Sequence, residues 1–67
     1  MKLSYEERVQ GSFIQCFYVF LEDYGWSFKR SWEEAVNHTA ECFGITAEEV
    51  EELVDEMREH IYNFDFS

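Results

Sequence analysis

The sequence predicts an all-α fold: a three-helix domain with a helix-turn-helix-like second and third helix. Three observations lead to this prediction. The pattern Ser/Thr-x-x-Glu, which caps helix N-termini, occurs at Ser4, Ser31 and Thr46. Apolar residues follow each cap at three- and four-residue spacing, as they do on one face of a helix. Gly25 and Gly44 follow the first two apolar runs, where a glycine suits the end of a helix.

The first helix is expected to span residues 5–24. Ser4 and Glu7 form its capping box, and Gly25 suits the left-handed backbone that ends a helix. Its inner face would carry Val9, Phe13, Cys16, Phe17, Phe20 and Tyr24. Residues 13–21 are also rich in aromatic and branched side chains, which favour strands, so a strand stays an alternative for this segment.

The second helix is expected at residues 32–43, between the Ser31 cap and Gly44. Ser31 and Glu34 would form its capping box. Its inner face would carry Trp32, Val36, Thr39, Ala40 and Phe43.

The third helix is expected at residues 47–62. Thr46 caps it, and Ile45 before the cap can pack on Val50. Its apolar face is unbroken and comprises Val50, Leu53, Val54, Met57 and Ile61. Residues 63–67 form an aromatic tail that we expect either to dock on the body of the domain or to fray.

The length of the chain predicts a single helical domain, residues 1–67, with a small core. A chain this short buries only about 60% of its unfolded surface. Its seven Phe, four Tyr and two Trp supply one core. Little material then remains around a ligand pocket of the usual size, about 300–1,000 Å³. We therefore expect a protein that is not an enzyme and needs no cofactor.

The charge balance is strongly acidic, with 15 acidic against 5 basic residues and a formal net charge of -10. A small domain needs a net charge of only about 2–8 for solubility, so the excess suggests a further role. Repulsion disfavours direct binding to nucleic acid or to an anionic membrane. A protein partner with a basic surface is favoured instead, because opposite charges speed the encounter.

The location is predicted from what the sequence lacks. The longest apolar-rich stretch, residues 13–21, is too short to span a bilayer. No basic segment precedes an apolar run with a cleavage site, and two cysteines do not form the dense disulfide framework of a small secreted domain. We expect a cytoplasmic protein, in the cytoplasm of the host cell if the gene is viral.

Residues 36–53 resemble a helix-turn-helix motif. The packing positions of that family are occupied here by Ala40, Gly44, Ile45, Val50 and Leu53. The resemblance implies two helices that cross closely. It does not extend to DNA binding, because the outward positions of the last helix are acidic where DNA-binding members place Arg, Lys, Asn or Gln. No specific family is identified.

The candidate partner-binding site is the acidic face of the third helix. It lies opposite the apolar face on a helical wheel and comprises Glu48, Glu49, Glu51, Glu52, Asp55, Glu56 and Glu59. A merely solvated surface is the alternative. Carboxylates spaced about 5–6 Å apart can imitate a phosphate backbone and occupy the basic groove of a nucleic-acid-binding protein. Small acidic phage proteins act against restriction or CRISPR machinery with this chemistry.

A second candidate surface is an apolar line on the other side of the first helix. It comprises Gly11, Ile14, Tyr18 and Leu21. One explanation is that the tail residues Phe64 and Phe66 cover it and make the first helix central. The other is a homodimer interface or a partner groove, which exposed apolar patches commonly mark.

Two other constellations are weaker. His38 and Cys42 share a helix face, but nothing in the spacing brings Cys16 or His60 to them, so no zinc site is expected. Residues 26–32 interleave aromatics with two cations, which suits single-stranded nucleic acid, but the acids of the chain outnumber these cations.

The sequence thus predicts a small acidic non-catalytic protein-binding module. Its most specific form is an inhibitor or antagonist that occupies a basic surface of its partner, such as a DNA-mimic, anti-defence or anti-CRISPR protein. The alternative is a homodimeric regulatory or adaptor protein that binds through the apolar face of the first helix. A small metal-binding protein is a third hypothesis.

Overall fold

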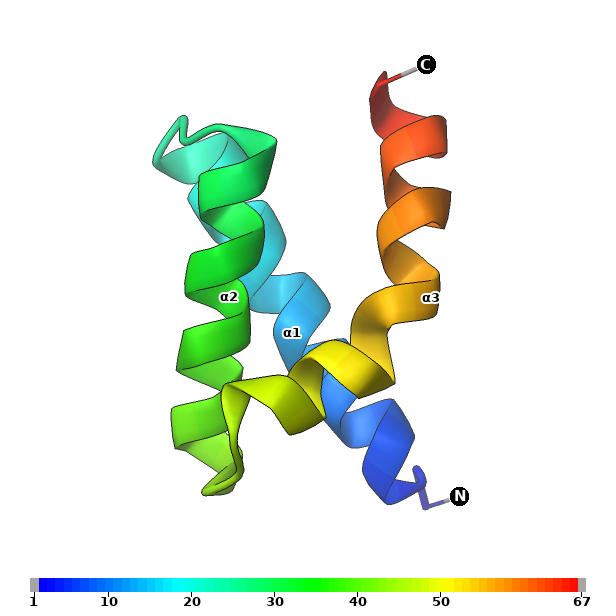
Figure 1. The fold of residues 1–67 in the computed structure, drawn as a ribbon. Helices are drawn as coiled ribbons and strands as arrows, with labels where there is room; N and C mark the ends of the chain where they lie inside the picture. The colour runs from blue at the N-terminus through cyan, green and yellow to red at the C-terminus, as the bar shows by residue number, and fades with distance from the viewer. Residues whose placement is uncertain (1, 67) are drawn as a thin grey trace.

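The computed structural model describes the backbone of residues 2–66 and the side chains of residues 2–61. Its elements are α1 (Tyr5–Tyr18), the π-helix η1 (Val19–Asp23), α2 (Phe28–Phe43) and α3 (Ala47–Phe66) (Figure 1). The prediction of an all-α, three-helix domain is confirmed. No strand occurs within residues 2–66, so residues 13–21 are helical and the strand alternative for them is wrong.

α1 begins at the predicted capping box. The Ser4 hydroxyl accepts from the Glu7 amide and the Glu7 carboxylate accepts from the Ser4 amide, each at 3.1 Å. At Val19 the helix widens into η1, and the Tyr24 amide donates to the Val19 carbonyl at 3.2 Å. A π turn holds more residues than an α turn, so Tyr24 leaves the inner face and is 59% exposed. The prediction that Tyr24 lies in the core is wrong.

α2 begins after Ser27, four residues before the predicted start at Trp32. The Ser27 hydroxyl caps the helix by accepting a backbone N–H at 3.2 Å, whereas Ser31 is fully buried within it. The predicted capping box at Ser31 is therefore wrong. The earlier start brings the Phe28 ring within 5.1 Å of Phe17 and 5.8 Å of Trp32, measured between centroids. Both serines suit a cap, and burial of this ring favours the earlier one.

The turn between α2 and α3 follows the prediction. Gly44 ends α2 in the left-handed conformation, at φ +66°. The Ile45 amide donates to the Ala40 carbonyl at 3.0 Å. The Thr46 hydroxyl accepts from the Glu49 amide at 3.1 Å and caps α3. Gly44, Ile45 and Thr46 thus join α2 to α3 through a short turn.

α3 extends further than predicted, to Phe66 instead of residue 62. No glycine or proline follows Ile61, so the chain carries no residue that stops the helix there. The tail predicted at residues 63–67 is therefore helical as far as Phe66. The side chains of Phe64 and Phe66 lie outside the described residues, and so does the cover of α1 that we expected from them.

One apolar core joins the three α-helices. Its buried members are Val9, Phe13, Phe17, Trp32, Ala35, Val36, Ala40, Val50 and Val54. Trp32 is central, with its ring centroid 4.6 Å from that of Phe13 and 5.6 Å from that of Phe17, both in edge-to-face arrangements. Truncating a buried Phe to alanine typically costs about 3–5 kcal/mol. The aromatic core therefore compensates for the small size of the domain.

The helices do not lie parallel. Figure 1 shows the start of α3 (yellow) crossing the lower part of the molecule, after which its later turns (orange to red) rise apart from α2 (green). The described residues have a radius of gyration of 11.5 Å and extents of 31 × 21 × 21 Å. No helix within residues 2–66 has the length and apolar character needed to cross a membrane.

Candidate functional site

The acidic face of α3 is at the surface. The helix buries Val50 and Val54 completely against α1 and α2, and this fixes its opposite face toward solvent. All of the predicted members are exposed: Glu48, Glu49, Glu51, Glu52, Asp55, Glu56 and Glu59. The structure therefore brings these carboxylates together on one helix face, along about three turns.

These carboxylates have no neutralising contacts within residues 2–61. None of the seven forms an ion pair or a hydrogen bond to another side chain of that range. Pairs four residues apart, such as Glu48–Glu52 and Glu52–Glu56, repel each other by about 0.2–0.5 kcal/mol each. Only Glu48 and Glu49 lie in the first turn, where the helix dipole favours acids. The face thus carries a repulsion that a positive surface would relieve.

Two arginines, Arg58 of α3 and Arg30 of α2, lie against aromatic rings. The Arg58 guanidinium lies 5.5 Å from the ring centroid of Trp32, and that of Arg30 lies 3.8 Å from Trp26. Both distances suit cation–π contacts. Arg58 belongs to α3 itself, so the one basic residue within residues 47–61 of the helix points across toward α2.

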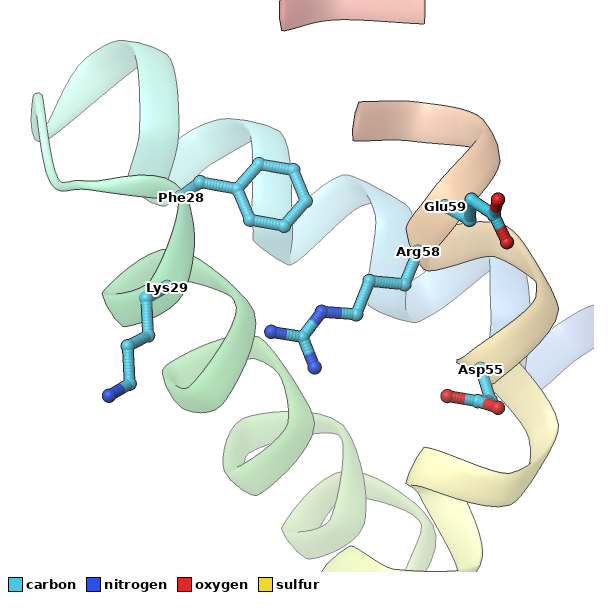
Figure 2. Close-up of a pocket in the computed structure, with 5 residues that line it drawn as sticks. All are labelled: Phe28, Lys29, Asp55, Arg58 and Glu59. Carbon is cyan, nitrogen blue, oxygen red and sulfur yellow. The ribbon is translucent and has the colours of Figure 1, made fainter. Parts of the chain in front are cut away.

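A groove adjoins the acidic face, where α3 diverges from the start of α2. It has a volume of about 550 Å³ and is lined by Phe28, Lys29, Asp55, Arg58 and Glu59 (Figure 2). Figure 2 shows the Phe28 ring and the Arg58 side chain projecting into the space between the two helices. Its volume is in the range of a ligand pocket, but it is an open groove and not the deep cavity that we expected so short a chain to lack. The groove was not predicted from the sequence, because the second helix was expected to begin at residue 32, after Phe28.

The apolar line on α1 is only partly open. Ile14, Tyr18 and Leu21 are half-buried and pack against the core, whereas Gly11 is exposed. Gln10, one turn before Ile14, donates to the Leu53 carbonyl at 2.8 Å, so this side of α1 faces α3. A Cβ added at Gly11 would meet no atom within 4 Å. α3 therefore lies against part of this side of α1, which we had expected to be either free or covered by the tail.

The remaining candidates for a site are the cysteines and the metal-binding residue types. Within the described residues, no group of three or more His, Cys, Asp or Glu side chains is placed to hold a metal ion. Cys16 is half-buried and Cys42 is exposed. Burial raises the pKa of the Cys16 thiol, and the neighbouring Cys42 adds to the rise.

Comparisons with models of known families, with curated proteins and with solved structures gave no significant match.

Proposed function

We propose that this protein is a non-catalytic binding module whose acidic α3 face occupies a basic surface of a partner protein. The observation that carries the proposal is the row of seven exposed carboxylates without a neutralising contact among residues 2–61. In its specific form, the module is an inhibitor that stands in for nucleic acid on the partner, as a DNA-mimic or anti-defence protein would.

Electrostatics supports a basic partner over other classes. The net charge of -10 repels phosphates and attracts a cationic surface from a distance. Carboxylates on successive turns of α3 lie about 5–6 Å apart, within reach of lysine and arginine side chains arranged to bind a nucleic-acid strand. Binding would release the repulsion along α3 as well as form new ion pairs, so both effects favour the complex.

The groove beside Asp55 and Glu59 gives the acidic face one aromatic neighbour among charged residues. Phe28 supplies an aromatic ring there, at the edge of the carboxylate row. Interfaces commonly combine a polar rim with aromatic anchors. A partner side chain seated on Phe28 would therefore fix the register of the surrounding ion pairs.

The experiment compares two variants that lose the same charge from different faces. The α3 variant carries Glu52→Gln, Asp55→Asn and Glu56→Gln. The control carries Glu33→Gln, Glu34→Gln and Glu41→Gln, which are exposed positions on α2. Tagged proteins are used to capture partners from cell extract at low and high salt, followed by mass spectrometry.

We expect the wild-type protein and the α2 control to retain the same basic protein at low salt, and the α3 variant to lose it. Equal capture by all three proteins would contradict the proposal. The half-buried state of Ile14, Tyr18 and Leu21 is the reason for preferring the acidic face over the apolar face of α1 as the principal contact.

A further inference from the structure

A second hollow lies on the molecule, between the end of α1 with η1 on one side and α2 on the other. It has a volume of about 340 Å³, and its lining residues are Gln15, Cys16, Val19, Phe20, Tyr24 and His38. None of these belongs to the acidic face or to the groove beside it. The lining contains no carboxylate, lysine or arginine, so its character is mainly apolar and aromatic.

Phe20 and Tyr24, two members of an aromatic cluster completed by Trp26, form one wall of this hollow. The ring centroids of Phe20, Tyr24 and Trp26 lie 5.0–5.4 Å apart in each pair. The backbone holds the cluster together, because the Trp26 amide donates to the Phe20 carbonyl at 3.1 Å. Gly25, with φ +70°, turns the chain so that Trp26 comes back beside Phe20. The π turn of η1 thus moves Tyr24 out of the core and into a surface wall, and π turns often occur at functional sites.

The wall leaves apolar surface in contact with water. Tyr24 is 59% exposed and Val19 is 37% exposed, and both line the hollow. The residue types gathered here, Tyr24 and Trp26 with Arg30 stacked on the latter, are those that contribute most binding energy in protein interfaces. The hollow therefore has the composition of a small docking site for a partner side chain.

Charge and ring chemistry indicate which side chain fits. The Trp26 ring already holds the Arg30 guanidinium, 3.8 Å from its centroid, so the ring that remains for a partner is that of Tyr24, which is 59% exposed. An exposed carboxylate adjoins the lining in the sequence, because Asp23, the last residue of η1, directly precedes Tyr24. A long side chain with an aliphatic stem and a planar cation would cover the rings and reach this acid.

We propose that the hollow receives an arginine side chain of a basic partner protein. The stem packs on Val19 and Phe20, and the guanidinium stacks on the Tyr24 ring, beside the neighbouring residue Asp23. Arginine suits the site better than lysine because its planar, weakly hydrated cation stacks on aromatic rings. The inference rests on the proposed function for the basic nature of the partner, but it assigns a second contact on a different face.

The test is an NMR titration of the 15N-labelled full-length protein with Nα-acetyl-arginine methylamide at low salt. The matched probe is the citrulline analogue, which has the same shape without the charge, and the norleucine analogue reports apolar binding alone. The protein variants are Tyr24→Ala and Val19→Lys, both at exposed positions where the fold tolerates change, and the α3 variant described above. Circular dichroism confirms that each variant is helical.

The arginine probe is expected to shift the amide signals of Gln15, Val19, Tyr24 and His38. Citrulline, and Tyr24→Ala with the arginine probe, should each bind about three- to fivefold more weakly, as loss of an exposed cation–π contact predicts. Val19→Lys should also weaken binding, because it puts a cation at the mouth of the hollow. The α3 variant should bind the probe as the wild-type protein does.

Two results would overturn the inference. One is that norleucine binds as tightly as arginine, since the hollow would then take any apolar side chain. The other is that the arginine shifts fall on α3 and disappear in the α3 variant but not in Tyr24→Ala, in which case the proposed function stands and this inference fails. Failure of the proposed function is seen separately, as partner capture that does not depend on the α3 acids.

Discussion

Ser27 and Ser31 carry the same hydroxyl in opposite surroundings. The Ser27 hydroxyl caps α2, whereas that of Ser31 is buried and has no hydrogen-bond partner among the described residues. A buried polar group without a partner costs free energy, and a cap gains it. The residue that starts α2 is therefore decided by tertiary burial of Phe28, which local sequence patterns do not show.

This contrast gives the first prediction. Ser27→Ala should lower the free energy of unfolding by about 1 kcal/mol, because the first turn of α2 loses its cap. Ser31→Ala should leave the stability unchanged or raise it, because the lost hydroxyl was unsatisfied. Urea denaturation followed by circular dichroism measures both. A larger loss for Ser31→Ala than for Ser27→Ala would show that the helix starts where the sequence pattern placed it.

Glu7 gives a prediction about pH. Its hydrogen bonds with the Ser4 amide and hydroxyl lower the pKa of the carboxyl below its ordinary value of 4.5. A lowered pKa in the folded state means that the stabilising effect is complete above the ordinary pKa and is lost as the pH falls through the lowered one. The stability difference between wild type and Glu7→Gln should therefore shrink in acid. A difference that stays constant down to low pH would contradict the capping role of the charge.

At the scale of elements, the sequence predicts regular helices well and their irregular ends poorly. The capping box at Ser4, the cap at Thr46 and the end of α2 at Gly44 were predictable, because each is set by residues next to it in the chain. The π turn that moves Tyr24 outward was not predictable, because the spacing of apolar residues in the sequence does not show that one turn holds an extra residue. The acidic face was predictable from periodicity, whereas the two hollows depend on how the helices diverge.

Glycines in α1 and after η1 give an element-level prediction. Gly11→Ala should stabilise the protein by about 0.5–1 kcal/mol, because Gly11 is helical and a Cβ there meets nothing within 4 Å. Gly25→Ala should destabilise it by about 1 kcal/mol, because the position has φ +70°. Thermal unfolding measures whether each substitution raises or lowers the stability. Sedimentation of wild type and Gly11→Ala tests whether the apolar face of α1 forms a homodimer. A self-associating wild type that Gly11→Ala makes monomeric would favour the homodimer alternative.

The repulsion along α3 gives a prediction that links stability to binding. Glu52→Lys replaces two repulsive four-residue pairs with attractive ones and should stabilise the protein by about 1 kcal/mol. The same change should weaken partner capture. Glu41→Lys on α2 is the control, since no acid lies four residues from it. If Glu52→Lys bound the partner normally, the carboxylates would be serving solubility alone.

At the scale of the whole molecule, a net charge of -10 acts on folding and on binding with opposite signs. Salt screens the repulsion within α3 and between helices, so it should raise the melting temperature. The same screening weakens attraction to a basic partner. A solvated acidic surface without a partner would show only the first effect, and this separates the two explanations of the charge.

The most direct measurement is the affinity of the captured partner for wild type, the α3 variant and the α2 control across a series of salt concentrations. We predict that wild type and the α2 control weaken by about tenfold or more between 50 and 300 mM NaCl, because ion pairs at the surface are screened over that range. The α3 variant should bind weakly throughout, with little dependence on salt. Binding by wild type that ignores salt, with an α3 variant of equal affinity, would contradict the account.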